Sequence, residues 1–200
     1  PEDAAVVVYC PGGGSGGLFR QEGLATQAML GHAGEQTVVP PGYLCCGYPQ
    51  DAGVNAAKAE EMTTENRVLF HRVANTLNYL DIKTVVGSCG TCYDQLEKYR
   101  FEEIFPGCRM IDIHEFLLEK GIKLDGVTGQ QYLYHDPCHS PIKTTTATAL
   151  TGQLLCQGVW LSGRCYGESG RFRVMRPGNA TQLKFRKQEE IEKKRAARPQ

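Results

Sequence analysis

Short runs of apolar, β-branched residues alternate along the chain with longer segments in which apolar residues recur every three or four positions. The first pattern predicts buried strands and the second predicts helices. In the first part of the chain the predicted strands are 4–10, 36–40, 83–88 and 109–113, and the predicted helices are 18–34, 55–80, 89–99 and 114–121. Strands that alternate with helices favour an α/β fold built on a parallel sheet. Gly34 is expected to cap the first helix, since glycine is the usual residue at that position.

The same order of elements begins again after residues 123–130, which we interpret as a linker. A predicted strand ends in "YHDPCH", a helix covers 146–158, and a second short strand leads into a loop with the sequence "GRCYGESG". Cys45-Cys46-Gly47 in the first part therefore aligns with Cys165-Tyr166-Gly167 in the second. A fixed internal repeat indicates two related units. We predict two α/β repeats, 1–122 and 131–200, each with a short parallel sheet flanked by helices.

The overall charge favours neither a nucleic-acid partner nor an anionic surface, because Lys and Arg together number 22, as do Asp and Glu. The stretch from Arg171 onward is basic, but its Glu and Lys residues lie three or four positions apart, which is typical of a solvated helix face. It lacks the interleaved aromatic residues of single-strand binders, so we expect no nucleic-acid partner. We also expect no membrane span, because no apolar run approaches the necessary eighteen residues.

Nine cysteines and the lack of a recognisable signal peptide favour a reducing compartment, where cysteines serve metal or redox chemistry. We therefore expect a cytoplasmic protein, with peripheral attachment to the cytoplasmic face of a membrane still compatible with the sequence. Cys108 and Cys156 have no special neighbours, and we expect both to be small buried apolar residues.

Five cysteines are predicted at strand ends or in the loops that follow strands: Cys10, the adjacent pair Cys45 and Cys46, and the C-x-x-C formed by Cys89 and Cys92. The carboxyl ends of parallel strands meet at one edge of a sheet, so these thiols are expected to converge. Helices that begin near them stabilise thiolates, which are the form that metals bind. Neighbouring cysteines do not readily form a disulfide with each other, so another use is expected for Cys45 and Cys46.

The sequence pattern alone leaves three possible functions for these cysteines open. A C-x-x-C between a strand and a helix is typical of thioredoxin-like dithiol sites. Four thiolates also suit tetrahedral zinc, in a structural zinc-binding domain or, without metal, an interaction domain. The vicinal pair favours a third use, because a thioredoxin-like site does not need it and neighbouring ligands strain a single tetrahedral ion. A multi-iron cluster has several metal corners and accommodates adjacent thiolates.

The motifs "CCGYP", "VVGSCGTCYDQLEKY", "YHDPCHSP" and "CYGESG" resemble the cysteine-rich CCG domain, which is found in the B subunit of heterodisulfide reductase and in the iron–sulfur subunit of glycolate oxidase. The segments "PPGYLCCGYPQ", "ENRVLFHRVANTLNYLDIKTVV", "FPGCRMIDIHEFLLEKG" and "RPGNATQLKFRKQEEI" resemble the C-terminal iron–sulfur part of large bacterial FAD-linked oxidoreductases of the lactate/glycolate oxidase type. The resemblance implies electron transfer through a 4Fe-4S or non-cubane iron–sulfur cluster, or thiol-disulfide chemistry. It places FAD, and the catalytic residues for 2-hydroxy acids, on a partner domain or subunit.

Carried over residue by residue, the resemblance implies that Cys45, Cys46, Cys89 and Cys92 ligate the cluster. The family's early cysteine falls at Gly13, and Cys10 lies three residues before it as an uncertain fifth thiol.

In the second repeat the resemblance implies Cys138 and Cys165, with Tyr166 in place of the next cysteine. A second C-x-x-C would fall about 43 residues further on, near position 209. Because the sequence given stops at 200, this repeat is expected to be truncated and to hold no cluster here.

Polar residues near these cysteines carry expectations of their own. We expect His135 and His139 to cap or hydrogen-bond the turn at Asp136-Pro137, the alternative being a mixed Cys/His metal site. Asp136 and Glu168 are expected to hydrogen-bond around a metal centre.

Overall fold

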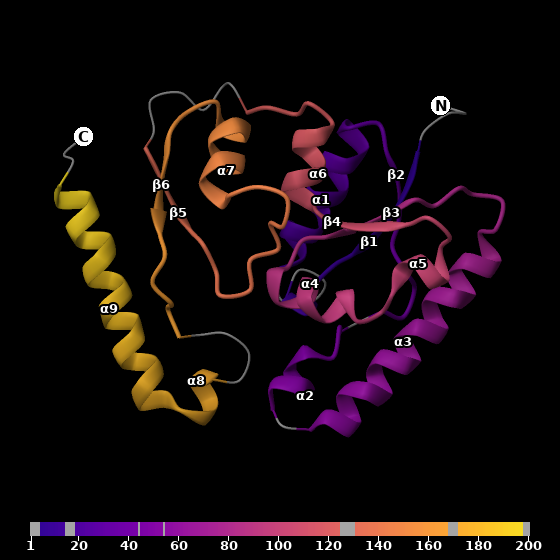
Figure 1. Cartoon of the computed structure of the whole chain (residues 1–200), viewed down its shortest axis with the longest axis horizontal. Coiled ribbons are helices and arrows are strands. Elements are labelled where there is room, and N and C mark those ends of the chain that lie inside the picture. The colour runs from indigo at the N-terminus through magenta and orange to yellow at the C-terminus, as the bar shows by residue number, and fades with distance from the viewer. Residues whose placement is uncertain are drawn as a thin grey trace.

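Strands and helices alternate along the chain as predicted, and the strands form two parallel sheets (Figure 1). The computed structural model describes residues 5–14, 19–43, 45–53, 55–124, 131–167 and 172–197. The strands are β1 (Val6–Cys10), β2 (Gln36–Val38), β3 (Thr84–Gly87), β4 (Arg109–Asp112), β5 (Tyr132–His135) and β6 (Val159–Ser162). The helices are α1 (Arg20–His32), α2 (Tyr48–Ala52), α3 (Ala56–Thr76), α4 (Gly90–Glu97), α5 (Phe101–Ile104), α6 (Ile113–Glu119), α7 (Ala147–Leu155), α8 (Phe172–Met175) and α9 (Pro177–Ala196).

The larger sheet has the strand order β2-β1-β3-β4, and every neighbouring pair is parallel. The chain runs from β1 outward to β2 and then returns across β1 to β3. The direction of winding therefore reverses between β1 and β3. In open parallel sheets a crevice forms outside the carboxyl ends of the strands at such a switch point, and ligands bind there.

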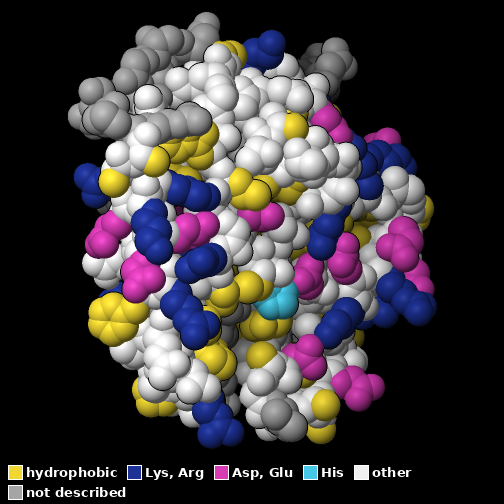
Figure 2. Space-filling view, turned by 60° about the vertical axis from the view of Figure 1, so that its left-hand side comes forward, with side chains coloured by type: hydrophobic (Ala, Val, Ile, Leu, Met, Phe, Trp, Pro, Cys, Tyr) yellow, Lys and Arg dark blue, Asp and Glu magenta, His cyan; other side chains and the backbone are white. Residues whose placement is uncertain are grey.

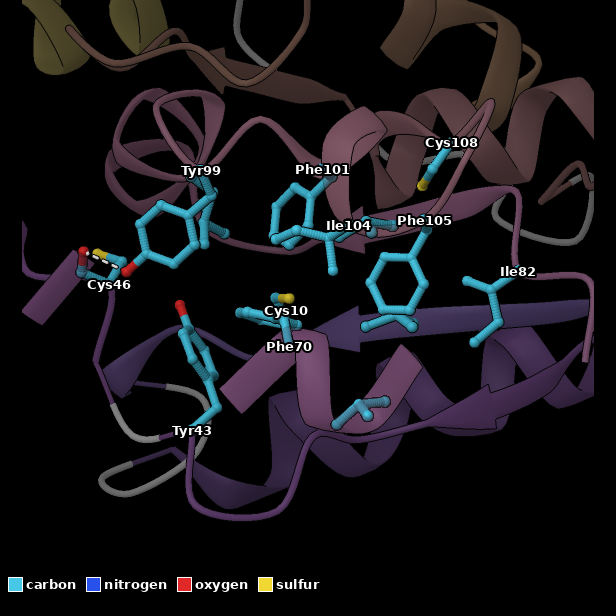
Figure 3. Packing of buried hydrophobic residues seen from close by; sticks show 14 of the residues in the cluster. Cys10, Tyr43, Cys46, Phe70, Ile82, Tyr99, Phe101, Ile104, Phe105 and Cys108 are labelled. Carbon is cyan, nitrogen blue, oxygen red and sulfur yellow. Dashed lines mark hydrogen bonds between the residues drawn. The ribbon is translucent and has the colours of Figure 1, made fainter. Parts of the chain in front are cut away.

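The central strand β1 is buried on both faces, which explains its continuous apolar sequence. Val6, Val8 and Cys10 pack in one core with side chains from α3, α4 and α5, which Figure 3 shows from close by. Val7 and Tyr9 point to the opposite core, which is completed by α1, α6 and α7. Helices thus cover both faces of the sheet, and α7 belongs to the second of these cores although it follows the predicted linker.

The ends of the elements follow the capping chemistry of the sequence. Gly34 adopts a φ of +85° directly after the cap of α1, so its predicted role is confirmed. The helix predicted over 55–80 ends earlier, at Thr76, and the residues after it form turns, one of them closed by a bond from the Leu80 amide to the Leu77 carbonyl. The short helices α2, α5 and α8 were not predicted, because four or five residues carry no periodic pattern.

The predicted second repeat, 131–200, contains the smaller sheet. Strands β5 and β6 pair in parallel, with α7 as the crossover between them. Gly47 and Gly167 occupy equivalent loops, and both have positive φ, at +89° and +77°. A Cβ on Gly47 would lie 3.6 Å from Met62 in α3, and one on Gly167 would lie 3.1 Å from Leu183 in α9. In both repeats, then, the loop glycine contacts a long helix.

The C-terminal helix α9 confirms that the basic end of the sequence is helical. Most of its residues are exposed, and basic and acidic side chains are interspersed on the face that contains it (Figure 2). Of the helices that the structure describes, none has both the length and the apolar character needed to cross a bilayer.

Candidate metal centre

The candidate site lies at the switch point between β1 and β3. The loop after β2 carries Cys45 and Cys46, and the chain that leaves β3 carries Cys89 at the N-terminus of α4, with Cys92 in its first turn. Two side chains fix the first of these loops from behind. The Asn66 amide donates a hydrogen bond to the Cys45 carbonyl (2.9 Å), and the buried Tyr99 hydroxyl donates one to the Cys46 carbonyl (3.0 Å).

The thiols of the two motifs are in direct contact. Cys46 Sγ and Cys92 Sγ are 3.2 Å apart, although the residues are separated by 46 positions in the sequence. Gly12, just beyond β1, forms another side of the site. A Cβ at Gly12 would lie 2.8 Å from Cys89 Cβ and 3.4 Å from Cys92 Sγ, so only glycine lets the backbone come this close. The predicted convergence of the pair and the C-x-x-C is therefore present in the fold.

The thiols perturb one another's pKa values. Hydrogen bonding to Cys92 lowers the pKa of Cys46, and the same cause, helped by the backbone N–H groups of Thr91 and Cys92, lowers the pKa of Cys89 to about 6. The pKa of Cys92 is raised, because its proton is shared with both neighbours. These directions favour the thiolate form of Cys46 and Cys89 over that of Cys92. Thiolates are the form that metals and iron–sulfur clusters require.

Cys45 lies at the more open side of the site. Its side chain is half-buried, and burial raises its pKa although the Gly47 N–H acts in the opposite direction. Cys46 is buried beside it. The adjacent cysteines therefore have different environments, one against the apolar core and one towards solvent.

Cys10 lies in the apolar core that Cys46 and Cys92 also border. It is 1% exposed, and Figure 3 shows it beside Phe70. Burial raises the pKa of Cys10 far above its usual range, which suits a neutral thiol. Cys108 is buried, as expected, and burial raises its pKa to about 11. The expectation for Cys156 was wrong: it is exposed, at the C-terminal end of α7, where it adopts the left-handed conformation (φ +54°).

Four cysteine thiols are chemically suitable ligands for a metal centre. In this structure, however, the sulfurs of Cys46 and Cys92 lie directly against each other. Among the described residues no group of three or more His, Cys, Asp or Glu side chains is arranged to hold a metal ion as it stands. Two thiolates on one tetrahedral zinc lie roughly 3.8 Å apart, for Zn–S bonds of about 2.3 Å. The 3.2 Å between Cys46 and Cys92 is shorter. Metal binding therefore requires these two sulfurs to separate.

A loop of the second repeat packs against the site. His139 accepts or donates two hydrogen bonds: its Nε2 lies 2.9 Å from the Tyr48 hydroxyl in α2, and its Nδ1 lies 2.6 Å from Asp94 Oδ2 in α4. A Cβ at Gly90 would overlap the His139 carbonyl oxygen. His139 thus links the segment after the cysteine pair to the helix that carries the C-x-x-C. We expected it to hydrogen-bond its own turn, and that expectation was wrong.

The second pair of predicted cysteines lies at a separate place, beyond the ends of β5 and β6. An interaction with Cys165 raises the pKa of Cys138. His135 also bonds away from the Asp136-Pro137 turn, to the Lys187 ammonium (2.8 Å), contrary to expectation. Asp136 Oδ1 is buried and has no hydrogen-bond partner within the described residues, and Glu168 lies outside them.

Several residues of the site were not identified from the sequence. Gly12 and Gly90 permit close backbone approach, while Tyr48, Asp94 and Tyr99 hold the cysteine segments in place. Gly12 sits in a conspicuous run of glycines directly after a strand, which was a usable signal. The other contacts join residues far apart in sequence and leave no local pattern.

Comparison with known families bears directly on this arrangement. Residues 8–97 match the cysteine-rich CCG domain. The matched segment runs from β1 through α4 and includes Cys45, Cys46, Cys89 and Cys92. The resemblance to the CCG domain predicted from the motifs is thus confirmed for this part of the chain.

A curated relative extends the comparison beyond the CCG segment. The chain is 28% identical over 180 residues to the B subunit of the CoM/CoB fumarate reductase of Methanothermobacter marburgensis. The match covers 86% of this chain and 34% of the relative, so the chain spans about a third of that protein's length. No solved structure matches. The CCG domain and the reductase relative together support an iron–sulfur electron-transfer module, and neither supports the FAD-linked, hydroxy-acid setting.

Proposed function

We propose that the first repeat binds an iron–sulfur cluster through Cys45, Cys46, Cys89 and Cys92 and acts as an electron-transfer module. The observation that supports this most strongly is the contact between the two cysteine motifs at the switch point of the sheet, with Cys46 and Cys92 sulfurs 3.2 Å apart. A cluster held there supplies single-electron transfer.

The surrounding residues define what the protein contributes. Tyr99 and Asn66 hold the carbonyls of the cysteine pair, so the loop keeps its position while the thiols separate. The first turn of α4 presents backbone N–H groups that stabilise Cys89 as a thiolate. The apolar core behind Cys46 keeps water from that side. Cys10, in the same core, is a less suitable ligand, since binding would require it to ionise there.

The wider setting belongs to the same proposal. We infer that the module passes electrons between a flavin-containing domain or subunit and an acceptor, as in FAD-linked lactate/glycolate-type oxidoreductases. Oxidation of the hydroxy acid would then be flavin chemistry outside these 200 residues. The matched relative is by name one subunit of a reductase, which supports partner subunits of some kind.

Anaerobic reconstitution with iron and sulfide tests cluster binding directly. We expect bound iron and acid-labile sulfide, a visible absorption band and an EPR signal on reduction. Cys46→Ser and Cys92→Ser should each lose most of the bound iron, because serine does not replace a thiolate ligand in a cluster. Cys156→Ser is the matched control, since Cys156 is an exposed cysteine outside the site and should leave iron binding unchanged. Equal iron in all three variants contradicts the proposal.

Thiol-disulfide chemistry at the first site is a second candidate function. The low pKa of Cys89 and the contact of its partner Cys92 with Cys46 both favour it. Insulin reduction by the protein, lost in Cys89→Ser and retained without iron, would favour this function. Structural zinc, the remaining alternative, predicts one tightly held zinc after purification and no colour on iron loading.

A further inference from the structure

A side chain from the second repeat joins the two segments that carry the cysteines of the first. His139 lies in the loop after β5, and its ring contacts Tyr48 at the start of α2 and Asp94 in α4. Tyr48 comes two residues after Cys46 in the sequence. Asp94 comes two residues after Cys92. The two segments whose sulfurs touch are therefore also connected, a short way further along each, by one imidazole ring.

The two nitrogens of this ring serve different partners. A carboxylate only accepts hydrogen bonds, so Nδ1 of His139 donates to Asp94 Oδ2 (2.6 Å). In the neutral ring Nε2 then accepts from the Tyr48 hydroxyl (2.9 Å). The rings of Tyr48 and His139 also pack edge to face, with centroids 5.1 Å apart. A single side chain thus makes directional contacts with both helices.

The loop that carries His139 is anchored independently of the imidazole. The buried carboxylate of Glu115 in α6 accepts hydrogen bonds from the backbone N–H groups of Lys143 (3.1 Å) and Thr144 (2.7 Å). It also accepts one from the Thr144 hydroxyl (2.6 Å). Lys143 Nζ lies 3.0 Å from Asp94 Oδ1. The imidazole therefore projects from a backbone that is already fixed, and its removal leaves these anchors in place.

Another link between α2 and α4 lies farther from the sulfurs. At the C-terminal end of α4, Lys98 Nζ is 2.8 Å from Asp51 Oδ2 of α2. These two side chains are 55% and 39% exposed, and exposed ion pairs contribute little. The same two helices thus offer an internal comparison between a bridge close to the cysteines and an ion pair at the surface.

We propose that His139 is a positioning residue for the first cysteine site, and that it holds the cysteine pair against the C-x-x-C. Metal binding requires the sulfurs of Cys46 and Cys92 to separate, and the bridge limits how far their segments move apart. It thereby restrains the ligands around a bound cluster. This last step rests on the proposed function, whereas the restraint on the thiols is present without metal. The second repeat then contributes a residue to a site whose ligands lie in the first.

The partition of disulfides in the metal-free protein measures the restraint. The protein is equilibrated with oxidised and reduced glutathione, alkylated and digested with trypsin, and the peptides are quantified by mass spectrometry. The cysteine pair lies in the tryptic peptide 21–58 and the C-x-x-C in 84–98. A disulfide between the peptides needs the two segments together, whereas one within 84–98 does not. We expect His139→Ala to lower the ratio of linked to internal disulfide at least about fivefold, the equilibrium factor for one lost hydrogen bond.

Further variants separate the two contacts of the ring. His139→Asn keeps a donor for Asp94 but is too short to reach Tyr48, so it should lower the ratio about fivefold. Tyr48→Phe removes the same bond from the other side and should have the same effect. The double variant should fall no further than either single one. Asp51→Asn is the matched control, because it breaks the exposed link between the same helices and should change the ratio less than about twofold.

Iron retention tests the step that rests on the cluster. After anaerobic reconstitution, a chelator should remove iron from His139→Asn about fivefold faster than from the unmodified protein. Absence of iron from the unmodified protein would contradict the proposed function, while the disulfide ratio would still decide the role of His139. That role is overturned if both His139 variants keep the ratio of the unmodified protein. It is also overturned if the double variant falls by the product of the single effects.

Discussion

The two repeats use the same glycine-containing loop in different surroundings. In the first, Gly47 follows two cysteines, and the loop meets a C-x-x-C at the carboxyl edge of a four-stranded sheet. In the second, Gly167 follows a single cysteine and a tyrosine, and the sheet has two strands within the described residues. Each glycine adopts positive φ and contacts a long helix, α3 or α9.

The difference shows that the scaffold and the chemistry of this fold are separable. A loop glycine of positive φ beside a long helix is present in both places, although Tyr166 stands where the first loop has Cys46. Four thiols with perturbed pKa values gather where β3 and α4 supply the C-x-x-C. Where no equivalent of that segment is described, Cys138 and Cys165 are the cysteines near the strand ends, and Cys165 raises the pKa of Cys138.

The first prediction concerns where the stability of the molecule lies. Phe70 is fully buried at the centre of the aromatic core of the first repeat, against Tyr99 and Phe101. Phe70→Ala should lower the free energy of unfolding by about 3–5 kcal/mol, because it removes a large buried side chain and leaves a cavity. Leu161→Ala in the second repeat, where the side chain is 42% exposed, should cost less than about 1 kcal/mol. Urea unfolding measures both. Equal losses would show that the repeats contribute alike.

The next prediction concerns the contact between Gly90 in α4 and the loop that carries His139. Gly90→Ala places a Cβ against the His139 carbonyl oxygen, so the loop of the second repeat must move. Such overpacking typically costs about 1–3 kcal/mol. Gly31→Ala in α1 is the matched control, because nothing lies within 4 Å of its Cβ position. There the loss of backbone freedom in the unfolded chain should stabilise the protein by about 0.5–1 kcal/mol. If both variants gain stability, the loop does not pack on α4 in solution.

A smaller effect is expected at the support of the cysteine pair. Tyr99→Phe removes the hydroxyl that donates to the Cys46 carbonyl and accepts from Asn66. The loss should be about 1 kcal/mol, the usual net value of a buried hydrogen bond. Alkylation of Cys46 should also become faster, since its loop is held less firmly. Tyr79→Phe, at a site 76% exposed, should change neither the urea midpoint nor the alkylation rate.

The smallest effect concerns pH at the outer strand β4, which lacks a described counterpart in the second repeat. A hydrogen bond to Asp112 raises the pKa of His114 above its usual value of 6.5. The stabilising contribution of this pair is therefore complete below about pH 6.5 and is lost as the pH rises through the raised pKa. It should amount to less than about 1 kcal/mol, because the His114 side chain is 57% exposed. Stability curves of the protein and of His114→Gln should converge above that pKa and separate below it.

The strands, the longer helices and the meeting of the cysteine motifs were predictable from the sequence. Local periodicity defines such elements, and the rule for the carboxyl ends of parallel strands then brings Cys46 and Cys92 together without any knowledge of distances. The burial of Cys10 was harder to foresee. It is the last residue of β1, and alternation along the strand turns its side chain into the core with Val6 and Val8, away from the loop that follows.

The remaining contacts depend on tertiary packing. His139 meets Tyr48 and Asp94, which are 91 and 45 positions away in sequence, and no local pattern in "HDPCHSP" specifies either partner. The exposed position of Cys156 at the end of α7 likewise has no signal in the neighbouring sequence.

The position of α7 has a consequence for any attempt to dissect the chain. Leu150 and Leu154 fill the same core as Leu30, Ile113 and Phe116. A fragment that stops at the end of α6 would leave that apolar surface facing water, and a chimaera that takes its second half from elsewhere would have to match its shape. The sequence suggests two separate modules. Because they share this core, we expect that neither folds stably without the other.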